Sequence, residues 1–201
     1  MALTSLRNDP ARAPSGNHAD PLALSRFETP VGPMVCAAVE AGVCLLEFSG
    51  RRALPNELGD LQELLDRPLG QEDQAHPGQH WLGAMECELA AYFAGSLRKF
   101  TIPLVTPGTE FERRVWQELL AIPYAQTRSY GQMAVAVNAP GGARAVGRAN
   151  GRNRIAIVIP CHRVIEAGGG LRGYGGGLER KRYLLDLERR SAGIEPGLFD
   201  A

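Results

Sequence analysis

The chain has 201 residues, enough for one large domain or two small ones, and its 22 basic and 22 acidic side chains give a formal net charge of zero. No apolar run approaches the ~20 residues of a membrane-spanning helix, so the composition excludes that class and predicts a soluble protein. The zero charge hides an asymmetry, because residues 1–104 carry 8 basic and 13 acidic side chains while residues 105–201 carry 14 and 9. A basic half-chain indicates a polyanionic partner or, as an alternative, a solvated cationic face.

The first residues, 1–21, are rich in Ala, Pro, Asn and Asp and contain no apolar stretch, which predicts a disordered tail and not a signal peptide. Four cysteines, at positions 36, 44, 87 and 161, follow no disulfide spacing, so we expect free thiols in a reducing, cytoplasmic compartment. No CxxC and no nearby HxxxH accompanies Cys36 and Cys44, and His76 and His80, four positions apart, stand in a Pro/Gly turn and not on a helix face, so we expect no metal site. The excess of arginine over lysine, 20 to 2, is typical of a GC-rich bacterial genome.

Residues 22–104 are predicted to form an α/β domain. Short apolar segments separated by turn residues predict antiparallel strands, and they are Ala23–Glu28, Met34–Val39 and Val43–Phe48. A helix is expected at Glu57–Asp66, and an apolar residue every four positions from Trp81 to Phe93 predicts another that ends at Gly95. Phe100–Leu104 is predicted as the last strand. This domain concentrates no reactive groups, so we interpret it as scaffold.

Residues 105–190 are predicted to be mostly helical. Capping boxes at Thr109–Glu112 and Ser129–Gln132 each predict the start of a helix. The second helix, the Pro/Gly turn after it and a short helix at Ala143–Asn150 together predict a helix-turn-helix. The remaining expected elements are a buried strand at Ile155–Ile159, a wing-like hairpin within 163–174, a helix at Leu178–Arg190 and a tail at 191–201.

The helix at 143–150 carries Arg144 and Arg148 separated by very small residues. Small side chains allow a helix to approach another surface closely, and the arginines can contact phosphates or enter a groove of DNA. Tight packing of the helix within a protein core is the alternative interpretation. The further arginines at 152 and 154 favour the nucleic-acid interpretation.

Cys161 and His162 stand side by side at the end of an apolar, β-branched run. A thiol is a poor nucleophile at neutral pH, and a neighbouring base that removes its proton makes it a good one. A buried, inert structural cysteine is the alternative. The pair alone does not decide between the two.

Taken together, the motifs resemble those of the O6-alkylguanine-DNA alkyltransferases, the methylated-DNA–protein-cysteine methyltransferase family. The matching stretches, in family order, are Tyr92-Phe-Ala-Gly95, Gly108-Thr-Glu-Phe111, Val115-Trp116, Ile122-Pro123, Ser129-Tyr130-Gly131, Arg144-Ala-Val-Gly147, Pro160-Cys-His-Arg-Val164, Gly173-Tyr174-x-Gly-Gly177, Lys181-x-x-Leu-Leu185 and Glu188. The resemblance implies a ribonuclease-H-like small sheet with a helix, followed by a winged helix-turn-helix domain. It implies no cofactor and a monomer that acts on double-stranded DNA bearing O6-alkylguanine, with O4-alkylthymine as a further candidate substrate.

The resemblance also implies a catalytic set. Cys161 takes the alkyl group in a single, irreversible turnover, and His162 accepts the thiol proton through a bridging water. Glu188 orients the imidazole, and Asn153 fixes the turn that presents the thiol. Taken alone, Glu188 could equally be a solvated charge on a helix face.

DNA contacts follow from the same resemblance. Tyr130 presses on a backbone phosphate and donates to the base, while Arg144 fills the place that the flipped nucleotide leaves in the stack. Gly147 and Arg148 lie on the same helix and are expected to contact DNA, through the minor groove. Taken alone, Tyr130 could be an ordinary first-turn residue of a helix.

Tyr174 and Gly175, within the loop Gly173–Gly177, are expected to wall the pocket that holds the flipped guanine, although the loop alone could be merely flexible. Gly175 departs from members with a hydroxyl residue there, which puts substrate preference in doubt. Arg154 replaces a common proline, and Ala125 replaces a frequent glycine. Two alternatives stay open from the sequence: a lesion-binding module without chemistry, and a Cys-His-Glu hydrolase.

Overall fold

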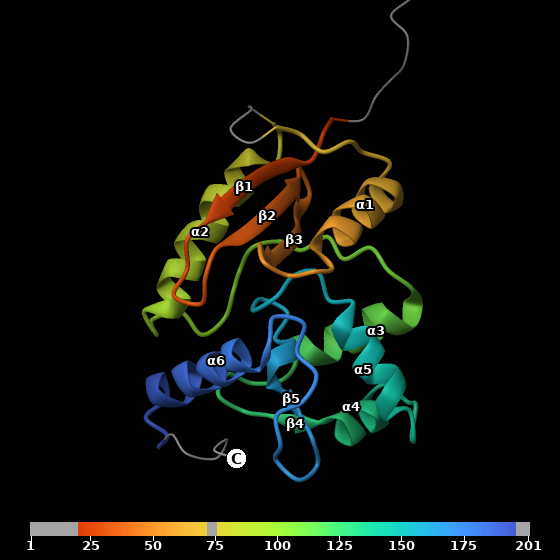
Figure 1. The fold of residues 1–201 in the computed structure, drawn as a ribbon, viewed down its shortest axis with the longest axis vertical. Helices are drawn as coiled ribbons and strands as arrows, with labels where there is room; N and C mark the ends of the chain where they lie inside the picture. Colours follow the sequence, from red (N-terminus) through yellow and green to blue (C-terminus); the bar gives the residue numbers. More distant parts are fainter. Residues whose placement is uncertain (1–19, 72–75, 196–201) are drawn as a thin grey trace, which may run out of the picture.

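The computed structural model describes residues 20–71 and 76–195. The two predicted tails, 1–21 and 191–201, therefore lie for the most part outside the described residues. In the part that is described, no helix is both long and apolar enough to cross a membrane. The N-terminal sheet and its helices occupy the upper half of Figure 1, and the helices that follow residue 109 occupy the lower half.

The N-terminal half is built on an antiparallel three-stranded sheet of order β1-β2-β3, as the sequence predicted. The strands are β1 (Ala23–Phe27), β2 (Met34–Val39) and β3 (Gly42–Phe48), with an irregularity of register at Ala37/Ala38. Helix α1 (Leu54–Leu65) and helix α2 (Gln79–Phe93) lie on opposite sides of the sheet (Figure 1).

Both faces of the central strand β2 are buried, which explains why its sequence is continuously apolar rather than alternating. Cys36 and Ala38 belong to one hydrophobic cluster together with Met85 of α2. Val35 and Ala37 belong to a second cluster that includes residues of α1. The sheet is therefore the middle layer of the N-terminal half.

The C-terminal half consists mainly of helices: α3 (Glu110–Leu120), α4 (Tyr130–Ala136), α5 (Ala143–Gly151) and α6 (Leu178–Ser191). Between them lie β4 (Arg128–Ser129), a 3-10 turn η1 (Cys161–Arg163) and β5 (Val164–Ile165). Both predicted capping boxes are present, at Thr109 and Ser129. The indole of Trp116 donates to Ala149 O at 2.9 Å and fixes α3 against α5.

Several predicted elements differ from the structure. Helix α1 begins three residues before the predicted Glu57, because Pro55 is well suited to the first turn of a helix. Phe100–Leu104 is not a strand and forms a single parallel bridge, Leu104 to Val43. The 163–174 segment forms no two-stranded wing, since β5 pairs in parallel with β4 and then turns back at Glu166, whose N–H donates to Gly170 O at 3.0 Å.

The predicted strand Ile155–Ile159 is also wrong. Two hydrogen bonds that span one residue each, Val158 N to Ala156 O and Cys161 N to Ile159 O (both 2.8 Å), turn the chain sharply. Of the segment 155–159, only the first residue joins the sheet, through a bridge between Ile155 and Leu46. An apolar β-branched run predicts burial correctly, but it does not determine whether the backbone is extended.

The two halves share one hydrophobic core, which runs from β1–β3 and α2 through α3, α5 and α6. Backbone hydrogen bonds also join them, because Leu46 N donates to Arg154 O at 2.8 Å and Ala156 N donates to Leu46 O at 2.7 Å. Strand β3 thus anchors the segment that leads to Cys161.

Candidate functional site

The backbone before Cys161 is strained. Ile157 has a φ of 70°, a conformation that a β-branched residue rarely adopts, and it is the central residue of the turn closed by Val158 N and Ala156 O. Pro160, with φ −82° and ψ 63°, is the central residue of the second tight turn. Strain of this kind persists only where surrounding contacts enforce it, and it clusters at functional sites.

Asn153 supplies those contacts. Its buried side-chain amide donates to Ile159 O at 2.9 Å and accepts from Ile155 N at 3.0 Å, so it bridges the two ends of the turned segment. The same nitrogen, Nδ2, donates to Cys161 Sγ at 3.2 Å. The predicted role of Asn153 in presenting the thiol is consistent with this geometry.

Cys161 is 8% exposed and lies at the start of η1. Burial raises its pKa to about 11, although the hydrogen bond from Asn153 acts in the opposite direction. Cys161 is therefore a thiol at neutral pH and requires a base before it can act as a nucleophile.

His162 is fully buried, and its Nε2 lies 2.8 Å from Glu188 Oε1. Burial lowers the pKa of His162 below its ordinary value, even though Glu188 opposes the shift, so the ring is neutral at pH 7. An ionised carboxylate can only accept a hydrogen bond, so Nε2 carries the ring proton and Nδ1 carries the lone pair. Nδ1 is buried and has no hydrogen-bond partner among the residues that the structure describes. The ring is thus prepared to act as a base through Nδ1.

Glu188, on α6, lies at the centre of a buried network. The guanidinium of Arg163 donates to both of its oxygens, with Nε at 2.9 Å from Oε2 and Nη2 at 2.9 Å from Oε1. The hydroxyl of Tyr92 donates to Oε1 at 2.9 Å, and the backbone N–H of Ala125 donates to Oε2 at 3.0 Å. Burial alone would raise the pKa of Glu188, but His162 and Arg163 lower it to about 2. The carboxylate stays charged at any physiological pH.

The predicted pocket residues surround a small cavity beside Cys161. It is lined by Glu47, Arg51, Asn150, Gly151, Asn153, Ala156, Cys161, Tyr174 and the loop glycines 173, 175 and 176, and its volume is about 10 Å³. A single water needs about that much space, so the cavity is too small for a purine in this conformation. The hydroxyl of Tyr174 is buried and makes no hydrogen bond within the described part of the chain.

Tyr130 closes the other side of the loop. Its hydroxyl donates toward Gly173 O at 3.2 Å and Arg172 O at 3.3 Å. Its ring lies over Gly147 of α5, where an added Cβ would come within 3.8 Å of the ring. The structure thus brings Tyr130, Gly147 and the glycine loop together next to Cys161.

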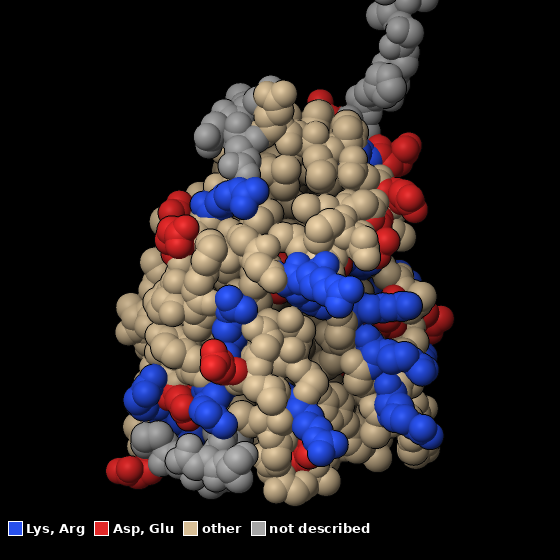
Figure 2. Space-filling view, in the orientation of Figure 1, with Lys and Arg blue, Asp and Glu red and all other residues tan. Residues whose placement is uncertain are grey.

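Arg144 and Arg148 are exposed on α5, away from the buried network. Figure 2 shows basic side chains in a row that descends beside α5 and begins near the junction of the two halves. This arrangement favours the interpretation of α5 as a nucleic-acid-binding helix over that of a helix packed on all sides.

The sequence did not identify four residues that shape this site. Tyr92, Glu47 and Arg51 come from the N-terminal half, so residues 22–104, predicted as scaffold, also contribute side chains around the site. Lys181 of α6 is the fourth: its buried ammonium donates to Val164 O at 2.6 Å and Arg172 O at 3.0 Å, and burial lowers its pKa to about 8. Tyr92 and Lys181 stood in the matched motifs, but nothing in their spacing indicated their partners.

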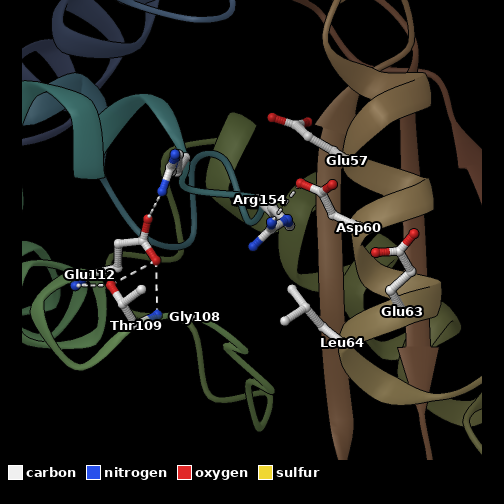
Figure 3. A pocket seen from close by; sticks show the side chains of 9 residues that line it. Glu57, Asp60, Glu63, Leu64, Gly108, Thr109, Glu112 and Arg154 are labelled. Atoms are coloured by element: carbon white, nitrogen blue, oxygen red, sulfur yellow. Dashed lines mark hydrogen bonds and ion pairs between the residues drawn. The ribbon is translucent and has the colours of Figure 1, made fainter.

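A separate cavity of about 600 Å³ lies between α1 and the start of α3, and it contains none of the predicted site residues (Figure 3). Glu57, Asp60 and Glu63 line one wall, while Thr109 and Glu112 lie on the other (Figure 3). Arg154 crosses this space to Asp60 at 3.1 Å. Arg154 therefore forms an ion pair between the two halves.

A helix-turn-helix with exposed arginines, next to a buried cysteine and an aligned base, defines a class: DNA-acting proteins with a cysteine nucleophile. Residues 110–190 match the family profile described as "6-O-methylguanine DNA methyltransferase, DNA binding domain". The methylated-DNA–protein-cysteine methyltransferase of Mycobacterium leprae is 45% identical over 174 residues, which cover 87% of this chain and 96% of that protein. The Mycolicibacterium paratuberculosis protein of the same name is 61% identical over 118 residues, 59% of this chain and 71% of that protein.

Solved structures agree with these matches. The O6-methylguanine methyltransferase of Mycobacterium tuberculosis superposes with a TM-score of 0.71 at 40% identity, covering 89% of this chain and 99% of that one. The structure of Mycobacterium tuberculosis OGT in complex with DNA superposes with a TM-score of 0.69 at 40% identity, and the match covers 84% of this chain and 94% of that one. The chain belongs to the methylated-DNA–protein-cysteine methyltransferase family, and the predicted fold class and family are confirmed.

Proposed function

We propose that Cys161 is the residue that accepts the alkyl group, with His162 as its base, Glu188 as the group that orients the base, and Asn153 as the residue that presents the thiol. The chain is a suicide repair protein for O6-alkylguanine in DNA. The observation that carries the assignment is the 2.8 Å hydrogen bond between His162 Nε2 and Glu188 Oε1, because it places the ring proton on Nε2 and leaves the lone pair on the buried Nδ1. No second base is needed.

The reaction balances with these groups alone. His162 Nδ1 takes the Cys161 proton through a bridging water, since no direct hydrogen bond joins the two side chains among the described residues. The thiolate attacks the alkyl carbon, so an S–C bond forms as the C–O6 bond breaks and the electron pair stays on the guanine. The guanine takes up one proton from Tyr130 and leaves uncharged, and the protonated His162 returns the thiol proton to the Tyr130 oxygen through solvent, so both side chains end in their starting forms. A thioether does not hydrolyse under mild conditions, so each molecule acts once.

Access to the lesion requires nucleotide flipping, because a stacked guanine cannot bring its O6 substituent to the thiol of a buried cysteine. We propose that α5 binds the minor groove of double-stranded DNA, that Arg144 fills the vacated place in the stack, and that Gly147 and Arg148 contact the backbone. The exposed position of both arginines on α5 supports this assignment. Tyr174 and Gly175 then wall the pocket around the flipped base.

We further propose that the protein acts as a monomer in the cytoplasm of a bacterium, in two functional regions at 22–104 and 105–190. Four free thiols, at Cys36, Cys44, Cys87 and Cys161, support a reducing compartment. The relatives named above are bacterial proteins. The reaction of the proposed site includes no cofactor.

Intact-mass analysis and peptide mapping after incubation with a duplex containing O6-methylguanine test the assignment. We expect one added methyl group per protein, on the Cys161 peptide, with a plateau at one equivalent. Cys161→Ala should bind the duplex and gain no mass, with Cys87→Ala as the matched control that still becomes methylated. Tight binding by the unmodified protein with no gain in mass would instead identify a lesion-binding module, and repeated turnover of an ester would identify a hydrolase.

A further inference from the structure

Arg51 reaches the alkylguanine pocket from the opposite half of the molecule. It follows β3 in the chain, and its side chain is only 11% exposed. Its Nη2 donates to Gly151 O, at the end of α5, at 2.7 Å. A residue of the N-terminal half is thus attached to the helix that carries Arg144.

The guanidinium of Arg51 lies directly against the glycine loop. A Cβ built on Gly175 would come within 2.7 Å of Arg51 Cζ and 2.9 Å of Nη2, closer than real Cβ contacts. Only glycine at 175 leaves space for the guanidinium in this position. The absence of a side chain at Gly175 and the presence of Arg51 are therefore two parts of one packing arrangement.

Two carboxylates hold Arg51 in place. Nη1 forms an ion pair with Glu47, which is 1% exposed, and Nη2 lies 3.0 Å from Glu57 Oε1. Arg51 and Glu47 both line the cavity beside Cys161, whose volume is about 10 Å³. The arrangement occupies space that a flipped guanine must enter.

We propose that Arg51 is a specificity-determining residue of the repair reaction: it closes the pocket over Gly175 and must be displaced before an alkylated base can enter. The inference rests on the proposed function. A duplex substrate can offset the cost of displacement with its contacts to α5, whereas a free base has no such contacts. Arg51 therefore selects against free alkylated bases and in favour of DNA.

The test compares second-order rate constants for alkylation of Cys161 by free O6-benzylguanine and by a duplex containing O6-methylguanine. We expect Arg51→Ala to raise the ratio of the free-base rate to the duplex rate about fivefold or more, equivalent to about 1 kcal/mol. Gly175→Ala should shift the ratio in the same direction, because its methyl group displaces the guanidinium. Arg52→Ala, at the exposed neighbouring position, is the matched control and should leave the ratio unchanged.

Loss of Arg51 leaves Glu47 buried without its partner, which destabilises the fold. The double variant Glu47→Gln/Arg51→Gln removes both charges, and the ratio of two rates in one protein sample does not depend on the folded fraction. If the ratio of the free-base rate to the duplex rate is unchanged both in this variant and in Gly175→Ala, Arg51 does not close the pocket, although the protein still repairs DNA. Absence of methyl transfer by the unmodified protein would instead overturn the proposed function. The role of Arg51 in closing the pocket would then be overturned as well.

Discussion

The hydroxyl of Tyr92 donates a 2.9 Å hydrogen bond to Glu188 Oε1, the same oxygen that accepts from His162. Tyr92 lies on α2 of the N-terminal half and Glu188 lies on α6, and both side chains are fully buried. The carboxylate that aligns the base is therefore held from both halves of the molecule. Correct alignment of His162 depends on the packing of α2 against the C-terminal helices.

Tyr92→Phe removes this donor while keeping the ring. A hydrogen bond to a buried charged group contributes about 2 kcal/mol, so we expect the free energy of unfolding to fall by about that amount. The methyl-transfer rate should fall less than in Glu188→Gln, because Arg163 and Ala125 still hold the carboxylate. Urea denaturation and single-turnover kinetics measure the two effects. Tyr183→Phe, a half-buried ring near Phe93, is the control, and equal losses in both variants would contradict a specific role for Tyr92.

Glu188 makes stability depend on acid pH. Its pKa in the folded protein is about 2, below the ordinary value of 4.5, so its contribution is fully present above pH 4.5 and is lost as the pH falls toward 2. The contribution is on the order of 3 kcal/mol. The lowered pKa of His162 acts in the same direction, because acid favours the unfolded, protonated ring.

Denaturant unfolding of the unmodified protein and of Glu188→Gln, at pH values between 7 and 3, measures this dependence. The difference in unfolding free energy between the two proteins should be constant from pH 7 to pH 5 and should shrink below pH 4.5. A difference that is the same at pH 3 as at pH 7 would show that the carboxylate is not held in its charged form.

The raised pKa of Cys161, about 11, predicts slow reaction with reagents that cannot use the His162 relay. Labelling of the Cys161 peptide by iodoacetamide should increase about tenfold per pH unit between pH 7 and pH 10, since only the thiolate reacts. Asn153→Ala should slow labelling further at each pH, because it removes the donor 3.2 Å from Sγ. Labelling that reaches a plateau near pH 8.5 would contradict the effect of burial. Quantitative peptide mass spectrometry separates Cys161 from Cys87.

Ala125 has a φ of 60°, a left-handed conformation that favours glycine. The left-handed conformation costs a non-glycine residue about 1–2 kcal/mol, partly offset by the lower chain entropy of alanine in the unfolded state. Ala125→Gly should therefore raise the free energy of unfolding by about 0.5–1 kcal/mol. The N–H that donates to Glu188 remains, so methyl transfer should be unchanged. Thermal unfolding measures the change in stability, and a repair assay on the same samples measures methyl transfer. A lower unfolding midpoint for Ala125→Gly than for the unmodified protein would show that the backbone at Ala125 is not strained.

Local signals were sufficient to predict much of the fold from the sequence. The capping boxes at Thr109 and Ser129 act over three residues, and both form as predicted. Strands β1–β3 were bounded by turn residues, which also act locally. The family resemblance then assigned Cys161, His162 and Asn153 to one site, and the structure brings Asn153 within 3.2 Å of the Cys161 sulfur, next to His162.

Long-range contacts account for most of what the sequence did not predict. Tyr92 and Glu188 are 96 positions apart, and Tyr92 has the spacing of an ordinary core residue on a helix. Ile157 reads as part of a strand, but the side chain of Asn153 and the bond to Leu46 enforce a turn there instead. Arg51 follows a strand in a polar segment, so nothing near it in sequence indicates Gly175. Each of these positions is determined by a partner that a local pattern cannot identify.

Arg144 provides the sharpest test of flipping. It is exposed on α5, and no hydrogen bond or ion pair joins it to Cys161, His162 or Glu188 in the described part of the chain, so its loss should leave the chemical step intact. We expect Arg144→Ala to lower the rate of repair of O6-methylguanine in a duplex by tenfold or more, because extrusion of a base costs about a few kcal/mol and the arginine offsets part of it. Reaction with free O6-benzylguanine, which needs no extrusion, should change by less than about twofold. Arg114→Ala, an exposed arginine on α3, is the matched control for loss of positive charge. Equal losses on both substrates would show that Arg144 supports the fold of the site and does not replace the flipped base.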